Sequence, residues 1–217
     1  MSRMEILDRV RQALGRVGGG TPVPPPVRIR IPEADRETRI TSLLARVEAL
    51  AGQGLRAATR EAALEMVRTA LAGRSAIASN APLLDECGVT GLPGVRAGIT
   101  NREQLRQLCA SAEVGITSAD YALADTGTLV MLSSPQEARM ISLLPPEHIA
   151  VVSSDRILSG LDELFAILPD PASVTSSMVL ITGPSRTADI EQILVRGVHG
   201  PGAITVLVID VTKQMSF

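Results

Sequence analysis

Three short stretches of this chain consist almost entirely of apolar residues, and they limit the folds that it can adopt. They cover residues 127–132, 178–181 and 204–209. Successive side chains of a strand point to opposite faces, so a strand without a polar side is covered on both faces. Such strands are typical of a parallel sheet packed between helices, and the runs therefore predict an α/β fold.

Segments with helical spacing of apolar residues alternate with strand candidates from residue 34 onward. We expect helices at 36–51, 60–72, 102–110, 136–142, 159–167 and 186–196, and a short helix around residues 83–84. We expect strands at 75–78, 113–117, 127–132, 148–153, 177–182 and 203–210. This alternation predicts a three-layer α/β architecture whose sheet is mostly parallel.

The first 33 residues differ from the rest in composition. Residues 1–14 are predicted to form an amphipathic helix, because four apolar residues between positions 6 and 14 share one helical face. Residues 15–33 are rich in glycine and proline and are predicted to be a linker, and residues 34–217 form the α/β domain. The helix either packs on its own domain, which is the more common arrangement, or docks on a partner.

The composition argues against several classes of function. The net charge is −2, and the chain has one tyrosine and two phenylalanines, so neither a basic surface nor an aromatic platform for nucleic acid is predicted. The first residues lack the pattern of a signal peptide, and no apolar run reaches the ~18–20 residues of a membrane span. We therefore expect a soluble, cytoplasmic protein.

The chain has few cysteines and histidines, the residues that most often bind zinc and iron. Its two cysteines, Cys87 and Cys109, are too few for a disulfide framework or for an iron–sulfur cluster, which usually takes four. With His148 and His199 they would supply four zinc ligands, but the spacing matches no compact zinc motif. The sequence therefore predicts neither a metal site nor a cofactor held by this chain.

Ligands of open α/β sheets bind at the carboxyl ends of the strands, so the residues after each predicted strand are the candidates for a site. The segment 183–189 follows one strand and is predicted to open a helix. Its backbone N–H groups and side chains would form a pocket for a carboxylate or phosphate. The candidate ligand-binding residues there are Gly183, Ser185, Arg186 and Thr187. Alternatively, Ser185 only caps the helix, and the acidic residues of the first turns would weaken anion binding.

A second candidate is the segment 115–128, at the entrance to the strand 127–132. Asp125 is a candidate nucleophile or base, and Thr126, Gly127 and Thr128 are candidate ligand-binding residues. The alternative is an ordinary turn, because Asp and Thr-Gly are common turn residues, and the spacing favours the turn.

A third candidate is the segment 133–139, in which Glu137 and Arg139 either face a ligand or lie in a solvated first turn. His148 begins a strand and so lies at the amino end of the sheet, where a structural role is favoured. His199 lies in a loop and is a weak catalytic candidate. No triad with a nucleophile elbow is present, so the sequence leaves open whether the protein is an enzyme.

Two segments carry a family resemblance when they are taken together. The first covers residues 115–152 and contains Asp125-Thr126-Gly127-Thr128, and the second covers residues 183–201 and contains Gly183-Pro184-Ser185-Arg186-Thr187 and Val198-His199-Gly200-Pro201. In order and separation they resemble the LUD-domain family, and within it the lactate-utilisation protein C group. The N-terminal helix and the linker resemble that family as well.

The resemblance implies a fold similar to the sugar-isomerase and CoA-transferase-like superfamily. It also implies that the chain works beside two iron–sulfur proteins in the oxidation of L-lactate to pyruvate, as the cluster-free subunit, with the clusters in its partners. One residue departs from the pattern: Asp125 stands where the family often has glutamate, the nucleophile of related CoA transferases. The shorter side chain weakens a covalent role for Asp125.

Two functions therefore remain open at this stage. The first is an accessory subunit that binds iron–sulfur partners and holds the carboxylate ligand. The second is a stand-alone enzyme or sensor for a small anionic metabolite, such as a phosphosugar, a carboxylate or a CoA ester.

Overall fold

The computed structural model describes residues 2–15, 34–190 and 193–210. The predicted linker therefore lies outside the described residues, apart from Gly15. The first helix, α1 (Arg3–Ala13), begins at Ser2, whose hydroxyl and the Glu5 carboxylate form a capping box. None of the residues of α1 is buried.

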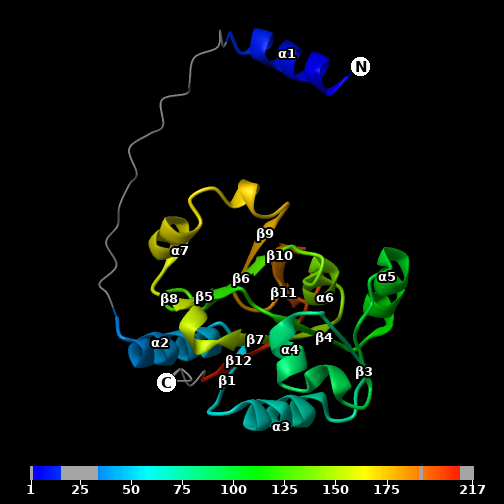
Figure 1. Ribbon diagram of the computed structural model, residues 1–217, viewed down its shortest axis with the longest axis vertical. Coiled ribbons are helices and arrows are strands. Elements are labelled where there is room, and N and C mark those ends of the chain that lie inside the picture. Colours follow the sequence, from blue (N-terminus) through cyan, green and yellow to red (C-terminus); the bar gives the residue numbers. More distant parts are fainter. Residues whose placement is uncertain (1, 16–33, 191–192, 211–217) are drawn as a thin grey trace, which may run out of the picture.

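The central layer is a parallel sheet of six strands, in the order β1-β12-β7-β4-β2-β3 (Figure 1). Alternate residues of its central strands contact different core clusters, so both faces are covered. The strands are β1 (Gln53–Ala57), β2 (Ala76–Ala78), β3 (Val95–Arg96), β4 (Val114–Ser118), β7 (Glu147–Ser153) and β12 (Ala203–Ile209). This confirms the predicted α/β class with a mostly parallel main sheet.

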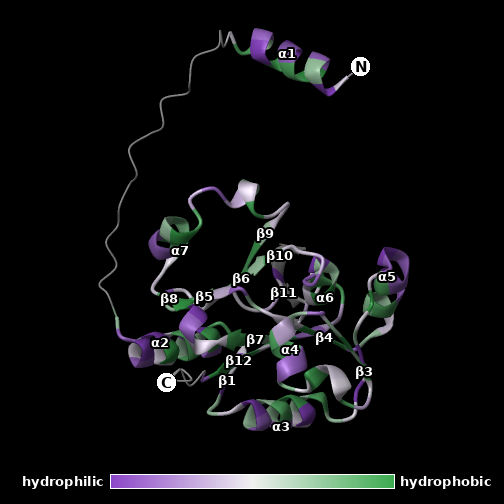
Figure 2. Cartoon of the chain, viewed as in Figure 1, coloured by the Kyte–Doolittle hydropathy of each residue, from purple (hydrophilic) through white to green (hydrophobic). Residues whose placement is uncertain are grey.

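Helices pack on both faces of this sheet. The helices α3 (Arg60–Leu71) and α4 (Pro82–Glu86) cover one face, and α2 (Arg36–Ala49), α5 (Arg102–Ser111) and α6 (Arg139–Leu143) lie on the other. The helices α2, α3 and α5 each begin at a capping side chain, which accepts a hydrogen bond from the backbone three residues later; the caps are Asp35, Thr59 and Asn101. Figure 2 shows hydrophilic and hydrophobic residues alternating along α2 and α3.

A second sheet of four strands packs beside α2. This sheet was not predicted from the sequence, and two of its strands were assigned to the parallel sheet. Its order is β8-β5-β6-β9, and the pairs β5–β6 and β6–β9 are antiparallel. The strands are β5 (Tyr121–Leu123), β6 (Thr128–Leu132), β8 (Ile157–Leu158) and β9 (Met178–Ile181). The apolar runs 127–132 and 178–181 are thus strands, but not of the parallel sheet.

The reason lies in how β6 is covered. Leu129 and Met131 pack toward the main sheet, whereas Val130 packs on the other side in a cluster with Leu164 of α7 (Leu161–Ile167). A strand of a second sheet can therefore be buried on both faces, and its sequence then lacks the alternation of a surface strand.

The predicted helix at 186–196 is also wrong. The structure has an antiparallel pair there, β10 (Arg186–Ile190) and β11 (Ile193–Arg196), in which Arg186 pairs with Arg196. Four of these residues are β-branched, which suits strands better than helices.

Among the described residues, no helix is both long and apolar enough to cross a membrane.

Candidate functional site

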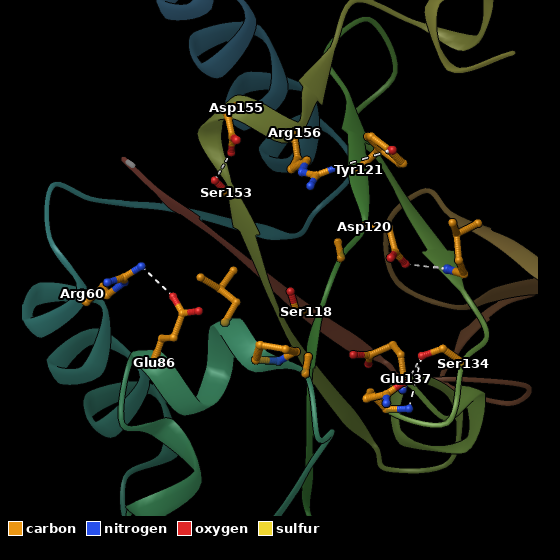
Figure 3. Close-up of a pocket in the computed structure, with 16 residues that line it drawn as sticks. Arg60, Glu86, Ser118, Asp120, Tyr121, Ser134, Glu137, Ser153, Asp155 and Arg156 are labelled. Atoms are coloured by element: carbon orange, nitrogen blue, oxygen red, sulfur yellow. Dashed lines mark hydrogen bonds and ion pairs between the residues drawn. The ribbon is translucent and has the colours of Figure 1, made fainter. Parts of the chain in front are cut away.

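A cleft of about 730 Å³ lies at the carboxyl ends of β2, β4 and β7. The ends of β4 and β7 contribute Ser118 and Ser153, and Ala81 follows β2. The turn after β4 and the segment before α6 complete its wall with Asp120 and Glu137. Figure 3 shows these polar side chains around one hollow. This is the edge at which open parallel sheets bind ligands.

Glu137 is the most perturbed group of the cleft. Its side chain is buried, and its Oε2 accepts a hydrogen bond of 2.7 Å from the hydroxyl of Ser79. Its Oε1 has no hydrogen-bond partner among the described residues. Burial raises the pKa of Glu137 to about 8, and the nearby charge of Asp120 adds a smaller contribution, whereas hydrogen bonding from the Ser79 hydroxyl and from the backbone of Ser118 acts against this. Glu137 is therefore largely protonated at neutral pH and can donate a hydrogen bond from a carboxylic O–H.

Asp120 is the second carboxyl group with a raised pKa. Burial raises its pKa, and the backbone N–H of Leu132, which donates to Oδ2 at 2.7 Å, partly offsets this. The Asp120 carboxylate is a candidate base, whereas the neutral carboxyl group of Glu137 is a candidate hydrogen-bond donor. Neighbouring groups with perturbed pKa values in a cleft are typical of functional sites.

Two arginines supply positive charge to the same cleft. The guanidinium of Arg156 lies 5.5 Å from the centre of the Tyr121 ring, in a cation–π arrangement. Arg60 on α3 forms an ion pair of 2.6 Å with Glu86 on α4. Arg156 is exposed and belongs to the short 3₁₀ helix that follows β7. The cleft thus combines the two arginines and the protonated Glu137 with the carboxylates of Glu86, Asp120 and Asp155. Since Arg60 is already paired with Glu86, Arg156 is the cation best able to bind the carboxylate of a ligand.

Asp120 of segment 115–128 lines this cleft, whereas the predicted site residues Asp125, Thr126, Gly127 and Thr128 of the same segment do not. Asp125 and Thr126 belong to the tight turn between β5 and β6, and the N–H of Gly127 donates to the Leu123 carbonyl at 3.0 Å. Gly127 has a φ of +71°, and a Cβ added there would lie 2.8 Å from the Cβ of Arg46. The turn alternative therefore describes the local structure, and a role in ligand binding stays a prediction.

The threonines of this turn form a short chain of hydroxyl groups. Thr128 Oγ1 lies 2.8 Å from the hydroxyl oxygens of both Thr126 and Thr182. These hydrogen bonds join β6 to the end of β9, so Thr126 and Thr128 have a structural role.

The predicted residues 183–187 do not open a helix, so the anion pocket loses the helix dipole on which the prediction rested. Gly183 lies in a turn, with a φ of +82°, against Leu50 at the end of α2. The Arg186 guanidinium donates to the Leu50 carbonyl. The side chain of Thr187 lies outside the described residues. Anion binding by this segment stays a prediction without its helix.

A smaller cleft, of about 210 Å³, brings Gly183 and Ser185 together with His199. It also includes His148, the second residue of β7, which is 1% exposed. The prediction that His148 begins a strand is confirmed. The two clefts lie at opposite ends of β7, because Ser153 at its carboxyl end lines the larger one.

The two cysteines are poorly placed to bind a metal. Cys87 and Cys109 are buried in different core clusters, and burial raises the pKa of both thiols, that of Cys109 to about 11. The described residues contain no group of three or more potential ligands that could hold a metal ion.

Sequence reasoning considered Glu137 but missed Arg156 and Arg60. Arg156 follows the predicted strand 148–153 by three residues. A search for candidate residues just after each predicted strand could therefore have found it. Arg60 lies on a helix, and only the packing of α3 beside α4 brings it to the cleft.

Comparisons with known proteins agree with this fold. The model of the LUD domain matches residues 40–209. A lactate utilization protein C from Halalkalibacterium halodurans is 34% identical over 158 residues, which are 69% of each chain. One from Macrococcus caseolyticus is 40% identical over 108 residues, and this match spans 48% of this chain and 47% of that protein. The crystal structure of a DUF162 family protein from Deinococcus radiodurans superposes with a TM-score of 0.64 and 18% identity, over 82% of this chain and 99% of that one.

Proposed function

The chain belongs to the LUD domain family, and on this premise we propose that it is the cluster-free subunit of a lactate-utilisation system. The names of its relatives support a role in lactate utilisation. In this proposal two iron–sulfur proteins are its partners, and the assembly oxidises L-lactate to pyruvate. The two buried cysteines support the assignment of the clusters to the partners, because a cluster usually takes four thiolates.

The larger cleft is the proposed binding site for the carboxylate ligand. One observation carries this: the buried Glu137 carboxyl has an unpartnered oxygen and a pKa of about 8, in a cleft that also holds Arg156. A protonated acid needs an acceptor, and the ligand's hydroxyl or keto oxygen would supply one. Arg156 would bind the carboxylate by charge-assisted hydrogen bonds.

Asp120 completes the proposed arrangement. Oxidation of lactate to pyruvate removes two electrons and two protons, one of them from the hydroxyl group. In this proposal the Asp120 carboxylate would accept the hydroxyl proton, the proton from C2 would pass to solvent, and the two electrons would go to the clusters of the partners. In this proposal the chain binds and orients the ligand, and the partners supply the redox groups.

The volume of the cleft favours a second candidate. About 730 Å³ is far more than a three-carbon acid fills and lies in the range of sites for larger ligands. The alternative is a stand-alone enzyme or sensor that binds a phosphosugar or a CoA ester. Binding of ribose 5-phosphate or acetyl-CoA, without binding of L-lactate or pyruvate, would favour it.

Capture of partners tests the subunit proposal. The tagged protein is expressed in its native host grown on L-lactate, isolated anaerobically, and assayed for bound proteins and iron. We expect cysteine-rich, iron-containing proteins to be recovered with it. A clean protein without iron, from cells that oxidise lactate, would contradict the proposal. A tagged unrelated protein from the same host is the control for nonspecific capture.

A further inference from the structure

The smaller cleft contains a buried histidine whose hydrogen bonding is incomplete. His148 is 1% exposed, and its Nε2 lies 2.7 Å from the hydroxyl oxygen of the buried Thr117. Its Nδ1 has no partner among the described residues. A buried polar atom without a partner costs free energy, and His148 lines the cleft, so Nδ1 is a candidate hydrogen-bonding partner for a molecule bound there.

The imidazole is neutral, and this limits the kind of ligand. Burial lowers the pKa of His148 to about 4. A neutral imidazole carries one N–H. If the Thr117 hydroxyl donates to Nε2, the proton is on Nδ1, which can then donate; if Nε2 carries the proton and donates to Thr117, Nδ1 can accept. A hydroxyl or an amide can satisfy either form, because each group both donates and accepts.

The described part of the wall favours an uncharged ligand, since its ionisable side chains are the imidazoles of His148 and His199. The described residues that line the cleft include no Asp, Glu, Arg or Lys. The nearby Arg186 is bound to the Leu50 carbonyl. A carboxylate or phosphate buried there would lack a counter-charge, which is costly.

The wall has an apolar side and a polar side. Val179, Ile181 and Ile204 contribute apolar surface, and Ser142 and Ser185 lie with His148 among the polar lining residues. The volume of about 210 Å³ suits a molecule with only a few non-hydrogen atoms. We propose that this cleft is a second binding site, for a small uncharged molecule with a hydroxyl or amide head and a short apolar chain.

This site is distinct from the carboxylate site. His148 of the smaller cleft and Ser153 of the larger cleft are five residues apart on β7, so their Cα atoms lie about 17 Å apart at ~3.3 Å per residue. The inference goes beyond the proposed function and does not depend on it.

Nuclear magnetic resonance of the imidazole nitrogens tests the proposal directly, because the sequence has two histidines. Spectra of the full chain and of His199→Gln assign the His148 signals. Lactamide and L-lactate have the same shape but differ in charge, and they are the two probes. We expect lactamide to shift the Nδ1 signal of His148 saturably, and L-lactate to leave it unchanged.

Two results would overturn the inference. No shift with lactamide would mean that the nitrogen is only hydrated, and an equal shift with L-lactate would mean that the cleft accepts anions, as the sequence predicts for residues 183–187. Arg60→Ala is the control variant, because it alters the larger cleft and should leave the lactamide response intact. A response lost in Arg60→Ala would place the effect of lactamide in the larger cleft.

Discussion

The hydroxyl of Ser79 donates a hydrogen bond of 2.7 Å to Oε2 of Glu137, across 58 residues of sequence. The backbone N–H of Asn80 donates to the Gln136 carbonyl at 2.9 Å, beside the first bond. Together they fix the segment before α6 to the end of β2. The Glu137 carboxyl is thereby held at the carboxyl edge of the sheet, where its Oε1 has no hydrogen-bond partner among the described residues.

The stability of the protein should fall with rising pH because of Glu137. Its pKa is about 8 in the folded state and 4.5 when unperturbed, so between these values the folded state binds more protons. The free energy of unfolding then decreases as the pH rises, by a few kcal/mol at ~1.4 kcal/mol per pKa unit. Glu137→Gln should remove this decrease, as measured by urea unfolding at several pH values.

His148 sets the useful range for that measurement. Its pKa is lowered from 6.5 to about 4, so between these values the unfolded state binds more protons and stability rises with pH. Above pH 6.5 the change of stability with pH that is caused by Glu137 is therefore not masked by His148.

Glu65→Gln, which changes an exposed glutamate, is the control variant, and its free energy of unfolding should decrease with pH as in the wild type. A decrease of unaltered size in Glu137→Gln would show that Glu137 is ionised in the folded protein.

Ser79→Ala should destabilise the fold and raise the pKa of Glu137 further. The change leaves Oε2 of a buried carboxyl without its donor, at a cost of about 1–3 kcal/mol. The decrease of stability with pH should then extend above pH 8. Urea unfolding checks both effects, with Ser111→Ala, an exposed helix position, as the control. Equal stabilities of the two variants would be inconsistent with the Ser79–Glu137 bond.

Gly115→Ala should be strongly destabilising, although the backbone of Gly115 is in an ordinary strand conformation. A Cβ at this position of β4 would lie 1.9 Å from the carbonyl oxygen of Ile141 in α6, and backbone cannot move aside easily. We expect a loss of about 3 kcal/mol or more. Gly91→Ala is the matched control, because no atom lies within 4 Å of its added Cβ. Thermal unfolding distinguishes them, and similar melting temperatures would argue against this close contact.

The sequence predicts the main sheet better than the second sheet. Strands such as 203–210 and 148–153 are apolar on both sides, and the pattern places them within one residue of β12 and β7. The same pattern assigns the strand 127–132 to the wrong sheet. A strand that is buried on both faces has a continuous apolar sequence, whether the strands beside it run parallel or antiparallel to it. The strands β1, β3, β5 and β8 were missed, and β10 and β11 fall in the predicted helix 186–196. The segments of β1 and β3 contain polar residues, and those of β5 and β8 have three residues or fewer, so their strand conformation depends on pairing with neighbouring strands.

The candidate site was harder to predict than the fold. Glu137 stands in a polar stretch that resembles a solvated first turn, and only its burial against Ser79 reveals a perturbed carboxyl. Arg60 and Arg156 are about a hundred residues apart in the sequence, and tertiary packing makes both of them lining residues of the cleft. Local sequence carries no signal of either relationship.

Deletion of residues 1–20 should weaken partner binding and leave the fold unchanged. The helix α1 exposes Met4, Ile6, Leu7 and Val10, and none of its residues is buried. An amphipathic helix with an exposed apolar face can dock in a groove of a partner. Binding of the purified iron–sulfur proteins to the full and shortened chains gives the affinities. Equal affinities would exclude a docking role for this helix.

A calorimetric titration of the purified protein with L-lactate and pyruvate tests the central claim most directly. We predict saturable binding of at least one of them, weakened about tenfold or more in Arg156→Ala, from the ~1.5–3 kcal/mol of a charged hydrogen bond. Arg186→Ala removes an arginine outside the larger cleft and should bind like the wild type. Binding that is lost in Arg186→Ala but kept in Arg156→Ala, or no binding of either acid, would contradict the account.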